Sequence, residues 1–273
     1  MPLLAKDLEN GFTDMINYSA NAVNKRIAND EQVDRNDFMK GLLQGKEEKS
    51  IKSMDEIVTN SNTIFVAGSD TTATLMTACT YYLLANPRAH KRAVEEVRGY
   101  FSSAADINFA KATARLPYLL AVLNEAFRLY PPVPTILERV VPNPGEYIEG
   151  IFVPGGTRVG VHQSSAGLSI SNFTQPEKFI PERWLPQVFQ DESSPFYADK
   201  RNAIQPFSYG PRNCIGKHLA YNEMRTIMAR LLWEFDMELD KSSYEWTKPY
   251  SDHKAWIVCN KPPLNVHIKR RYD

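Results

Sequence analysis

The chain has 273 residues, of which 43% are hydrophobic and 23% charged, which is ordinary for a globular protein with one large domain or two small ones. Basic and acidic residues both number 32, so no charge excess points to a nucleic-acid partner. The three cysteines are too widely spaced for a disulfide framework. Charge at Lys6 and Asp7 comes too early for a signal peptide, and no apolar run reaches the roughly 20 residues that span a bilayer.

The first half of the chain carries the spacing of helices. Ser53 and Glu56 match a capping box, and the nearly uncharged segment that follows predicts a buried central helix. Asn86-Pro87 ends that helix, and Pro87 is suited to start the next one. Apolar residues at helical spacing predict helices over 3–30, 35–44, 53–85, 87–98 and 115–130.

The second half changes texture after Tyr130-Pro131-Pro132. Short valine and isoleucine runs between proline and glycine turns predict a β-rich region over 133–161, and 162–213 reads as an irregular segment. A helix is expected over 214–235, followed by closing strands over 254–260 and 264–269. The expected fold class is mainly α with small β elements, in a single domain.

One cysteine, one arginine and two glycines lie within ten residues in the stretch Phe207-Ser-Tyr-Gly-Pro-Arg-Asn-Cys-Ile-Gly216. Cys214 would open a helix, whose positive end favours a thiolate, and the N–H groups of Ile215 and Gly216 can point at the sulfur. Gly210 permits a turn that side chains would block. The alternatives are a buried packing cysteine, or a zinc site with His218, which would lack two further ligands. Cys79 and Cys259 are interpreted as packing residues.

The pattern F-x-x-G-x-R-x-C-x-G resembles the haem-ligand loop of cytochrome P450 enzymes. The resemblance implies a P450-like fold, covering only the C-terminal part of a typical member, and haem b with Cys214 as the axial iron ligand. Gly216 would then allow close approach of the flat macrocycle, and Arg212 would pair with a propionate carboxylate. Phe207 and Gly210 complete the expected cofactor-binding loop.

Ala67-Gly68-Ser69-Asp70-Thr71-Thr72 resembles the family's oxygen-binding motif. A helical glycine costs about 1 kcal/mol relative to alanine. Thr71 can bond back to the carbonyl of Ala67, and together the two features could open a groove for dioxygen and water. Asp70 and Thr71 are therefore candidates for proton delivery, with Gly68 beside the cofactor. The alternative is a small-residue crossing point between helices.

Glu125-Ala-Phe-Arg128 places two opposite charges on one helix face. Alone, this pattern is more often a surface ion pair of little energetic weight. The family pairs it with an arginine in a P-E-R-F-like segment, here Pro181-Glu-Arg183-Trp184. The resemblance implies that Glu125, Arg128 and Arg183 form a buried network that fixes the haem loop, with Trp184 as a mild variation on Phe.

Arg139 follows the Pro131-Pro132 turn, where the resemblance implies a bond to a haem propionate; the alternative is a surface charge at a strand end. Many members carry A-x-x-H-R-D before the P-E-R segment, but His162 is misplaced for that motif and receives no role. The residues expected to line the substrate side of the haem are Ile64, Phe65, Thr72, Val133, Ile136 and Leu137.

The resemblance implies a haem-thiolate monooxygenase that uses dioxygen, NADPH-cytochrome P450 reductase and a hydrophobic small-molecule substrate. Gln205-Pro-Phe and Ala220-Tyr-Asn-Glu-Met-Arg225 look most like fungal secondary-metabolism members. Such proteins sit in the endoplasmic reticulum membrane, whereas this chain as written reads as cytosolic or peripheral. A non-catalytic fragment that binds haem weakly or not at all is one alternative, and a haem-thiolate isomerase or dehydratase is another.

Overall fold

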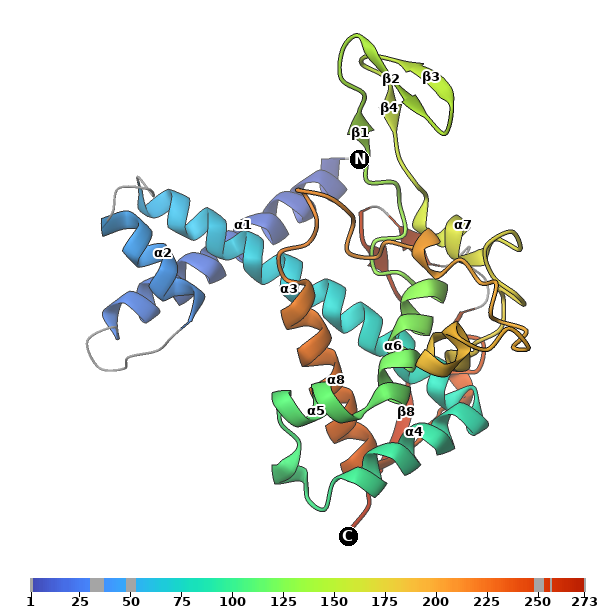
Figure 1. The fold of residues 1–273 in the computed structure, drawn as a ribbon. Coiled ribbons are helices and arrows are strands. Elements are labelled where there is room, and N and C mark those ends of the chain that lie inside the picture. Colours follow the sequence, from blue (N-terminus) through green and yellow to red (C-terminus); the bar gives the residue numbers. More distant parts are fainter. Residues whose placement is uncertain (1, 30–36, 48–52, 248–252, 256, 273) are drawn as a thin grey trace. The chain divides into compact units, whose positions relative to one another are not determined.

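The structure is a computed structural model that describes residues 2–29, 37–47, 53–247, 253–255 and 257–272. The chain divides into two compact units, residues 1–70 and 71–273, and each is described by itself. Helices dominate both units, and the strands are short (Figure 1).

The first unit contains α1 (Pro2–Ala28), α2 (Phe38–Glu47) and the beginning of α3 (Met54–Leu84). The N–H of Glu56 donates to the Ser53 hydroxyl at 3.2 Å, so Ser53 caps α3 as its sequence predicts. The Ser19 hydroxyl of α1 donates to Asn62 of α3 at 2.9 Å. Val23 and Ile57 supply the buried apolar side chains of this unit. Within the described residues, the hydrogen bond from Ser19 and the rings of Tyr18 and Phe65, whose centres are 5.3 Å apart, join the first and third helices.

The prediction that the whole apolar stretch of α3 is buried is wrong for its first part. Ile64, Phe65 and Val66 are 44%, 46% and 39% exposed, whereas Leu75 and Cys79 are fully buried. Composition reports how apolar a helix is but not which neighbours cover it. Among the described residues of α3, burial is complete at Ile57 near its start and again at Leu75 and Cys79, but not at Ile64 and Phe65.

The second unit is built around α6 (Pro117–Leu129). Ten of its residues are buried, so the predicted apolar stripe of α6 is in fact covered on most sides. Glu96 accepts hydrogen bonds from the N–H groups of Tyr118 and Leu119 at 2.7 and 2.9 Å, which caps the start of α6. The helices around it are α4 (Pro87–Tyr100), α5 (Phe109–Arg115), α7 (Gln163–Leu168) and α8 (Lys217–Glu234). Figure 1 shows α6 between α7, α4 and α8.

The strands that the structure describes form two-stranded antiparallel pairs. Strand β2 (Gly145–Ile148) forms a hairpin with β3 (Ile151–Pro154), and Glu146 lies opposite Val153. The remaining pairs are β1 (Arg139–Val140) with β4 (Arg158–Val159), β5 (Phe235–Leu239) with β8 (Val266–Arg270), and β6 (Lys254–Ala255) with β7 (Cys259–Asn260).

Several predicted bounds need correction. The helix predicted over 214–235 begins at Lys217, because the N–H of Cys214 donates to the carbonyl of Phe207 at 2.9 Å and closes a loop instead. The same helix ends one residue early, since Phe235 starts a strand whose partner, β8, lies far along the chain. The single strand predicted over 254–260 is the β6–β7 pair. The helix predicted over 35–44 is α2, which begins at Phe38, after the bend at Asp37, and continues to Glu47; positions 35 and 36 lie outside the described residues.

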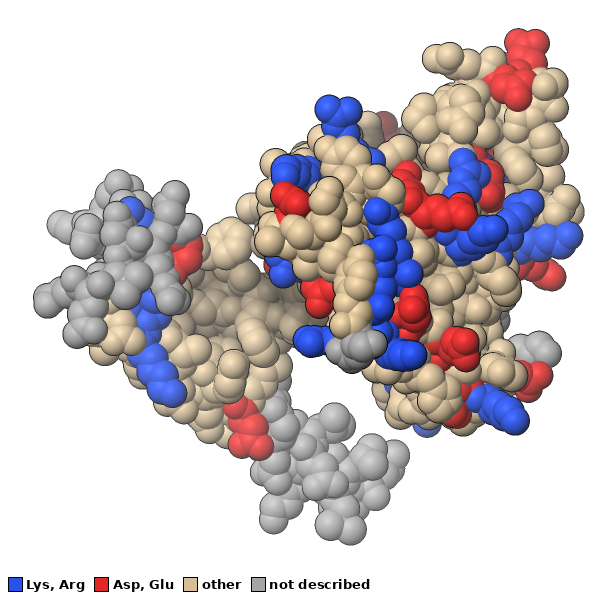
Figure 2. Space-filling model, turned by 90° about the horizontal axis from the view of Figure 1, so that it is seen from below, with Lys and Arg blue, Asp and Glu red and all other residues tan. Residues whose placement is uncertain are grey.

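Between the helices, 3-10 turns shape the long irregular segment: η3 (Pro181–Trp184), η4 (Pro186–Phe189) and η5 (Arg201–Ala203). Two more, η2 (Ala104–Asp106) and η6 (Lys241–Ser243), lie elsewhere in the second unit. Figure 2 shows basic and acidic side chains interspersed over the second unit. Over the described part of the chain, every helix is too short or too polar to cross a membrane.

Candidate functional site

The loop before α8 is folded tightly on itself. The N–H of Cys214 bonds to the carbonyl of Phe207, and the N–H of Asn213 bonds to the carbonyl of Gly210 at 3.0 Å. Gly210 has φ 81° and Ser208 has φ 61°, a left-handed conformation that side chains rarely adopt. The Ser208 hydroxyl accepts a hydrogen bond of 3.0 Å from Arg139, so the strained residue also receives a cation from β1.

Cys214 presents its side chain at the surface of this loop. It is a free, exposed cysteine, two residues before Gly216, the N-terminal cap of α8. The other two cysteines are buried, and burial raises the pKa of Cys79 to about 12. Among the described residues, no three His, Cys, Asp or Glu side chains gather to hold a metal ion. The zinc alternative thus lacks the ligands it requires, and Cys214 is the one described thiol that is open to a partner.

Phe207 anchors the loop in the core. Its ring lies 5.1 Å from that of Phe127 in α6 and 5.2 Å from that of Tyr221 in α8. The Tyr221 hydroxyl donates to Asn124 at 2.9 Å, and burial raises the pKa of Tyr221 to about 12. The first residue of the motif therefore joins the loop to both helices that flank it.

The structure brings the predicted Glu125–Arg128–Arg183 set together in full burial. Oε1 of Glu125 accepts from Nη2 of Arg128 at 2.7 Å and from Nε of Arg183 at 3.2 Å. It also accepts from the N–H of Ile180, while Oε2 accepts from Nε of Arg128 at 2.9 Å. The side chains of Glu125, Arg128 and Arg183 are 0% exposed. A carboxylate removed from water in this way needs such donors to compensate for its lost hydration.

Arg128 uses its remaining donors on backbone carbonyls. Nη1 bonds to Gly167 at 2.7 Å and to Pro176 at 2.5 Å, and Nη2 bonds to Lys178 at 2.9 Å. A Cβ atom added to Gly167 would meet the carbonyl oxygen of Arg128 well under 3.0 Å, so only glycine fits there. One guanidinium thus binds α7 and the segment 175–180 to α6.

Two side chains that the sequence did not assign complete the network. Trp184 donates from Nε1 to Oε2 of Glu125 at 2.8 Å, a bond that phenylalanine cannot make. The carboxylate of Asp199, whose side chain is 1% exposed, pairs with Nη1 of Arg183. Asp199 belongs to none of the family motifs. The sequence therefore carries no signal for its role, which becomes visible only when the structure places it next to Arg183.

Further contacts lead from the network toward the cysteine loop. Arg201 donates from Nε to the carbonyl of Arg183 at 2.6 Å, and its guanidinium lies 4.4 Å above the ring of Phe189. The N–H of Gln205 donates to Oε1 of Gln163 at 2.6 Å, which ties the start of the loop to α7. The segment that follows His162 lacks the A-x-x-H-R-D motif, but its residue Gln163 still binds the backbone at the start of the loop.

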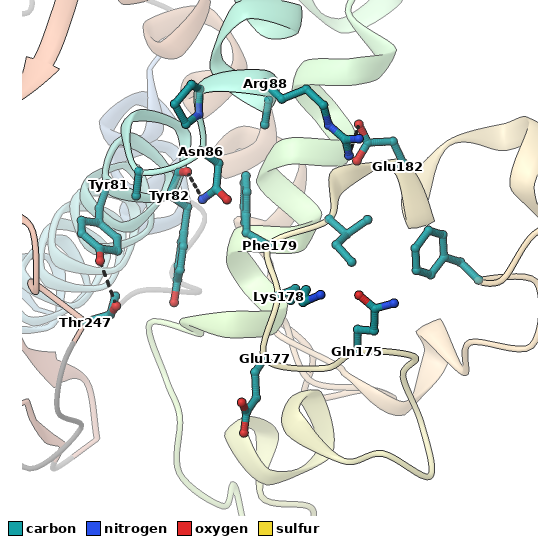
Figure 3. A pocket seen from close by; sticks show the side chains of 15 residues that line it. Tyr81, Tyr82, Asn86, Arg88, Gln175, Glu177, Lys178, Phe179, Glu182 and Thr247 are labelled. Carbon is teal, nitrogen blue, oxygen red and sulfur yellow. Dashed lines mark hydrogen bonds and ion pairs between the residues drawn. The ribbon is translucent and has the colours of Figure 1, made fainter.

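An open cleft of about 910 Å³ lies beside this network, between the end of α3 and the segment 175–182 (Figure 3). Tyr82 and Phe179 stack on its wall with their ring centres 5.1 Å apart. The same segment turns the carbonyls of Pro176 and Lys178 toward Arg128. The segment that carries Phe179 therefore lines the cleft with its side chains and binds Arg128 with its carbonyls.

The other predicted residues lie in both units. In the first, Gly68 has nothing within 4 Å of an added Cβ atom, and Asp70 is half-buried. Thr71 is half-buried and Thr72 is 8% exposed in the second unit. Arg212 is exposed and Val133 half-buried, whereas Ile136 and Leu137, which precede β1 in the chain, are each 44% exposed. His162 caps α7 by accepting from the N–H of Ser165 at 3.3 Å.

The comparisons with known proteins agree on one family. The family model for cytochrome P450 matches residues 3–268. The chain is 44% identical over 256 residues to trichothecene C-4 hydroxylase of Trichoderma arundinaceum, which is 93% of this chain and 50% of that protein. It is 41% identical over 257 residues to averantin hydroxylase of Aspergillus parasiticus, which is 94% of this chain and 50% of that protein.

A third relative, the cytochrome P450 monooxygenase olcB of Penicillium canescens, is 44% identical over 254 residues, which is 93% of this chain and 51% of that protein. The chain therefore spans about half the length of the curated relatives it matches. Since a family model covers nearly all of the sequence and the cysteine loop keeps the motif, the chain belongs to the cytochrome P450 family.

Proposed function

We propose that this chain forms the haem-thiolate part of a monooxygenase that inserts one oxygen atom of dioxygen into a hydrophobic small molecule. The observation that carries the proposal is the exposed thiol of Cys214 on a loop anchored through Phe207. Family membership implies haem and iron. The cofactor and the reaction are proposed together, because a single cysteine thiolate bound to haem iron is the ligation that P450 enzymes use to cleave dioxygen.

The residues of the loop fit haem b. Cys214 offers an exposed thiol. Gly216 lies close to it and, as a glycine, places no side chain beside the sulfur. Arg139 lies against the loop through Ser208, and Arg212 is exposed on it, so each guanidinium is available to a propionate carboxylate. When bound, the haem would supply the iron that activates dioxygen, and thiolate ligation favours O–O cleavage.

The motif in α3 is proposed to handle protons. A threonine hydroxyl can both donate and accept, and an adjacent carboxylate can exchange protons with water. Thr71 would hold a proton donor toward the oxygen site, with Asp70 supplying protons from solvent. Gly68, around which the space is open, would lie beside the cofactor. Apolar side chains would exclude water and contact the substrate, namely Ile64, Phe65, Val133, Ile136 and Leu137, together with the methyl group of Thr72.

The names of the relatives support a hydroxylation in secondary metabolism. Two of the three proteins above are named hydroxylases, and the third is named a monooxygenase. We propose NADPH-cytochrome P450 reductase as the electron donor and the endoplasmic reticulum membrane as the site of action, both by resemblance to the family.

The test is the spectrum of the reduced carbon-monoxide complex of the haem-supplemented chain. A red-shifted, thiolate-type Soret band is expected, and Cys214→Ala should abolish it. Cys259→Ala, at a buried cysteine, is the matched control and should keep the band. Absence of the band from the folded parent chain would overturn the proposal.

A second candidate is a non-catalytic fragment, favoured by the match to only about half the length of the relatives. Hydroxylation of a hydrophobic substrate with NADPH, dioxygen and reductase would exclude it. Turnover that needs neither reductant nor dioxygen would instead indicate a haem-thiolate isomerase or dehydratase.

A further inference from the structure

Asp199 is a buried acid outside the motifs that define the candidate site. Its side chain is 1% exposed, and its carboxylate pairs with Nη1 of Arg183. Oδ1 also accepts a hydrogen bond of 2.7 Å from the N–H of Thr174. A carboxylate is rarely buried to this degree unless it is paired, so its placement calls for a specific role.

The role follows from the net charge of the buried network, which Asp199 balances. Glu125 carries one negative charge, and Arg128 and Arg183 carry two positive charges, so those three residues alone would bury a net positive charge. Asp199 brings the buried set to neutrality. Because an uncompensated buried charge is strongly destabilising, Arg183 requires this second acid in addition to Glu125.

Asp199 also lies in the segment that leads into the cysteine loop. Its neighbour Arg201 donates to the carbonyls of Arg183 and Phe196, both at 2.6 Å. The chain then runs through Gln205, held by Gln163, to Phe207, whose carbonyl accepts from the N–H of Cys214. Hydrogen bonds at Arg201, Gln205 and Cys214, linked by the chain between them, therefore connect the surroundings of Asp199 to the backbone that carries the thiol.

We propose that Asp199 is a positioning residue, which neutralises Arg183 and thereby holds the segment 199–207 and the Cys214 loop in register. Its effect on the loop does not depend on a bound group. Its effect on thiolate ligation rests on the proposed haem-thiolate function.

The first experiment uses the full chain without haem and measures amide hydrogen exchange. Asp199→Asn keeps the shape and removes the charge, and exchange over residues 199–214 should become about tenfold faster or more, as expected for loss of a hydrogen bond to a charged group. Asp191→Asn is the matched control, since that exposed carboxylate accepts its hydrogen bonds, among the described residues, from Ser193 nearby. Equal exchange in the Asp199→Asn variant and the parent would overturn the proposal.

A double variant separates charge balance from shape. If Asp199 acts by neutralising Arg183, adding Arg183→Gln to Asp199→Asn removes the buried excess, and loop exchange should be no faster than in Arg183→Gln alone. Strictly additive effects would contradict this. Asp199→Glu retains the charge and should keep the exchange rate closer to the parent's than Asp199→Asn does. If the two substitutions are equally disruptive, the charge is not the requirement. The same conclusion follows if neither variant folds.

The second readout is the reduced carbon-monoxide spectrum of the haem-supplemented chain. Asp199→Asn should shift a larger fraction of the bound haem from the thiolate-type band to a non-thiolate band, while Asp191→Asn should leave the fraction as in the parent. An unchanged fraction would overturn the link to Cys214. If the parent shows no thiolate band, the proposed function fails, and the haem-free exchange experiment still decides the role of Asp199.

Discussion

The indole nitrogen of Trp184 donates a hydrogen bond of 2.8 Å to Oε2 of Glu125. Trp184→Phe keeps a flat apolar ring but removes this donor from a buried carboxylate. We expect a loss of about 1.5–3 kcal/mol in the free energy of unfolding, the usual worth of a hydrogen bond to a charged group. Urea denaturation measures it, with Tyr209→Phe at an exposed ring as the control. An unchanged midpoint would mean that the bond contributes nothing.

Glu125 is the hub of the network, so its charge should matter most. Glu125→Gln leaves Arg128 without its buried counter-ion and turns an amide N–H₂ toward one of the donors. We expect a loss of about 3–5 kcal/mol in stability, measured by denaturant unfolding. Glu177→Gln, in the exposed segment beside the cleft, should change stability by no more than about 0.5 kcal/mol. Similar values for the two variants would refute the buried-pair argument.

Two glycines give opposite predictions. Gly167→Ala drives a Cβ atom into the carbonyl of Arg128 and should destabilise by about 1–3 kcal/mol, as overpacking does. Gly99→Ala, inside α4, meets nothing within 4 Å and should stabilise by about 1 kcal/mol through helix propensity. Thermal unfolding of both variants tests the pair, and a lower midpoint for Gly99→Ala would contradict the prediction.

The three cysteines should differ in reactivity. Burial raises the pKa of Cys79 to about 12, so this thiol is protonated and covered at neutral pH. Cys214 is exposed. Brief iodoacetamide treatment of the native haem-free chain, followed by peptide mass spectrometry, should therefore label Cys214 before Cys79 and Cys259. Equal labelling in native and urea-unfolded protein would show that the buried cysteines are not protected.

His90 makes stability depend on mild acid. Burial chiefly lowers the pKa of His90; the positive charge of Arg98 lowers it further, and Asp236 opposes both. Below the ordinary histidine pKa of about 6.5 the unfolded chain therefore binds more protons than the folded chain, and stability falls as the pH falls through that value.

The measurement is the urea midpoint at about pH 7.5 and about pH 5.5, above and below the ordinary histidine pKa. His90→Gln should reduce the difference between the two midpoints, because a group that cannot titrate is removed from the linkage. His218→Gln, at an exposed site on α8, is the control. A difference unchanged by His90→Gln would exclude this histidine as the source.

The sequence predicted the local features best. The capping of α3 by Ser53, the α6 helix and the meeting of Glu125 with Arg128 follow from spacing within a few residues. The meeting of these two with Arg183 came from the family resemblance, because nothing in local spacing joins residues so far apart.

What the sequence did not predict depends on long-range partners. Strand β5 continues the apolar pattern of α8, and only its pairing with β8 makes it a strand. The exposure of Ile64 and Phe65 depends on which elements cover α3, which composition does not report. Asp199 has the ordinary appearance of a loop acid until its neighbours are known.

Arg128 takes three of its partners from the main chain, at Gly167, Pro176 and Lys178. Main-chain carbonyls are supplied by every residue type, so the side chains of 176 and 178 are free to vary without altering this bond. A combinatorial library could therefore randomise exposed positions such as Glu177 and Lys178, reshaping the cleft that they line, while the buried charges remain untouched. Gly167 is the position that such a library must leave fixed.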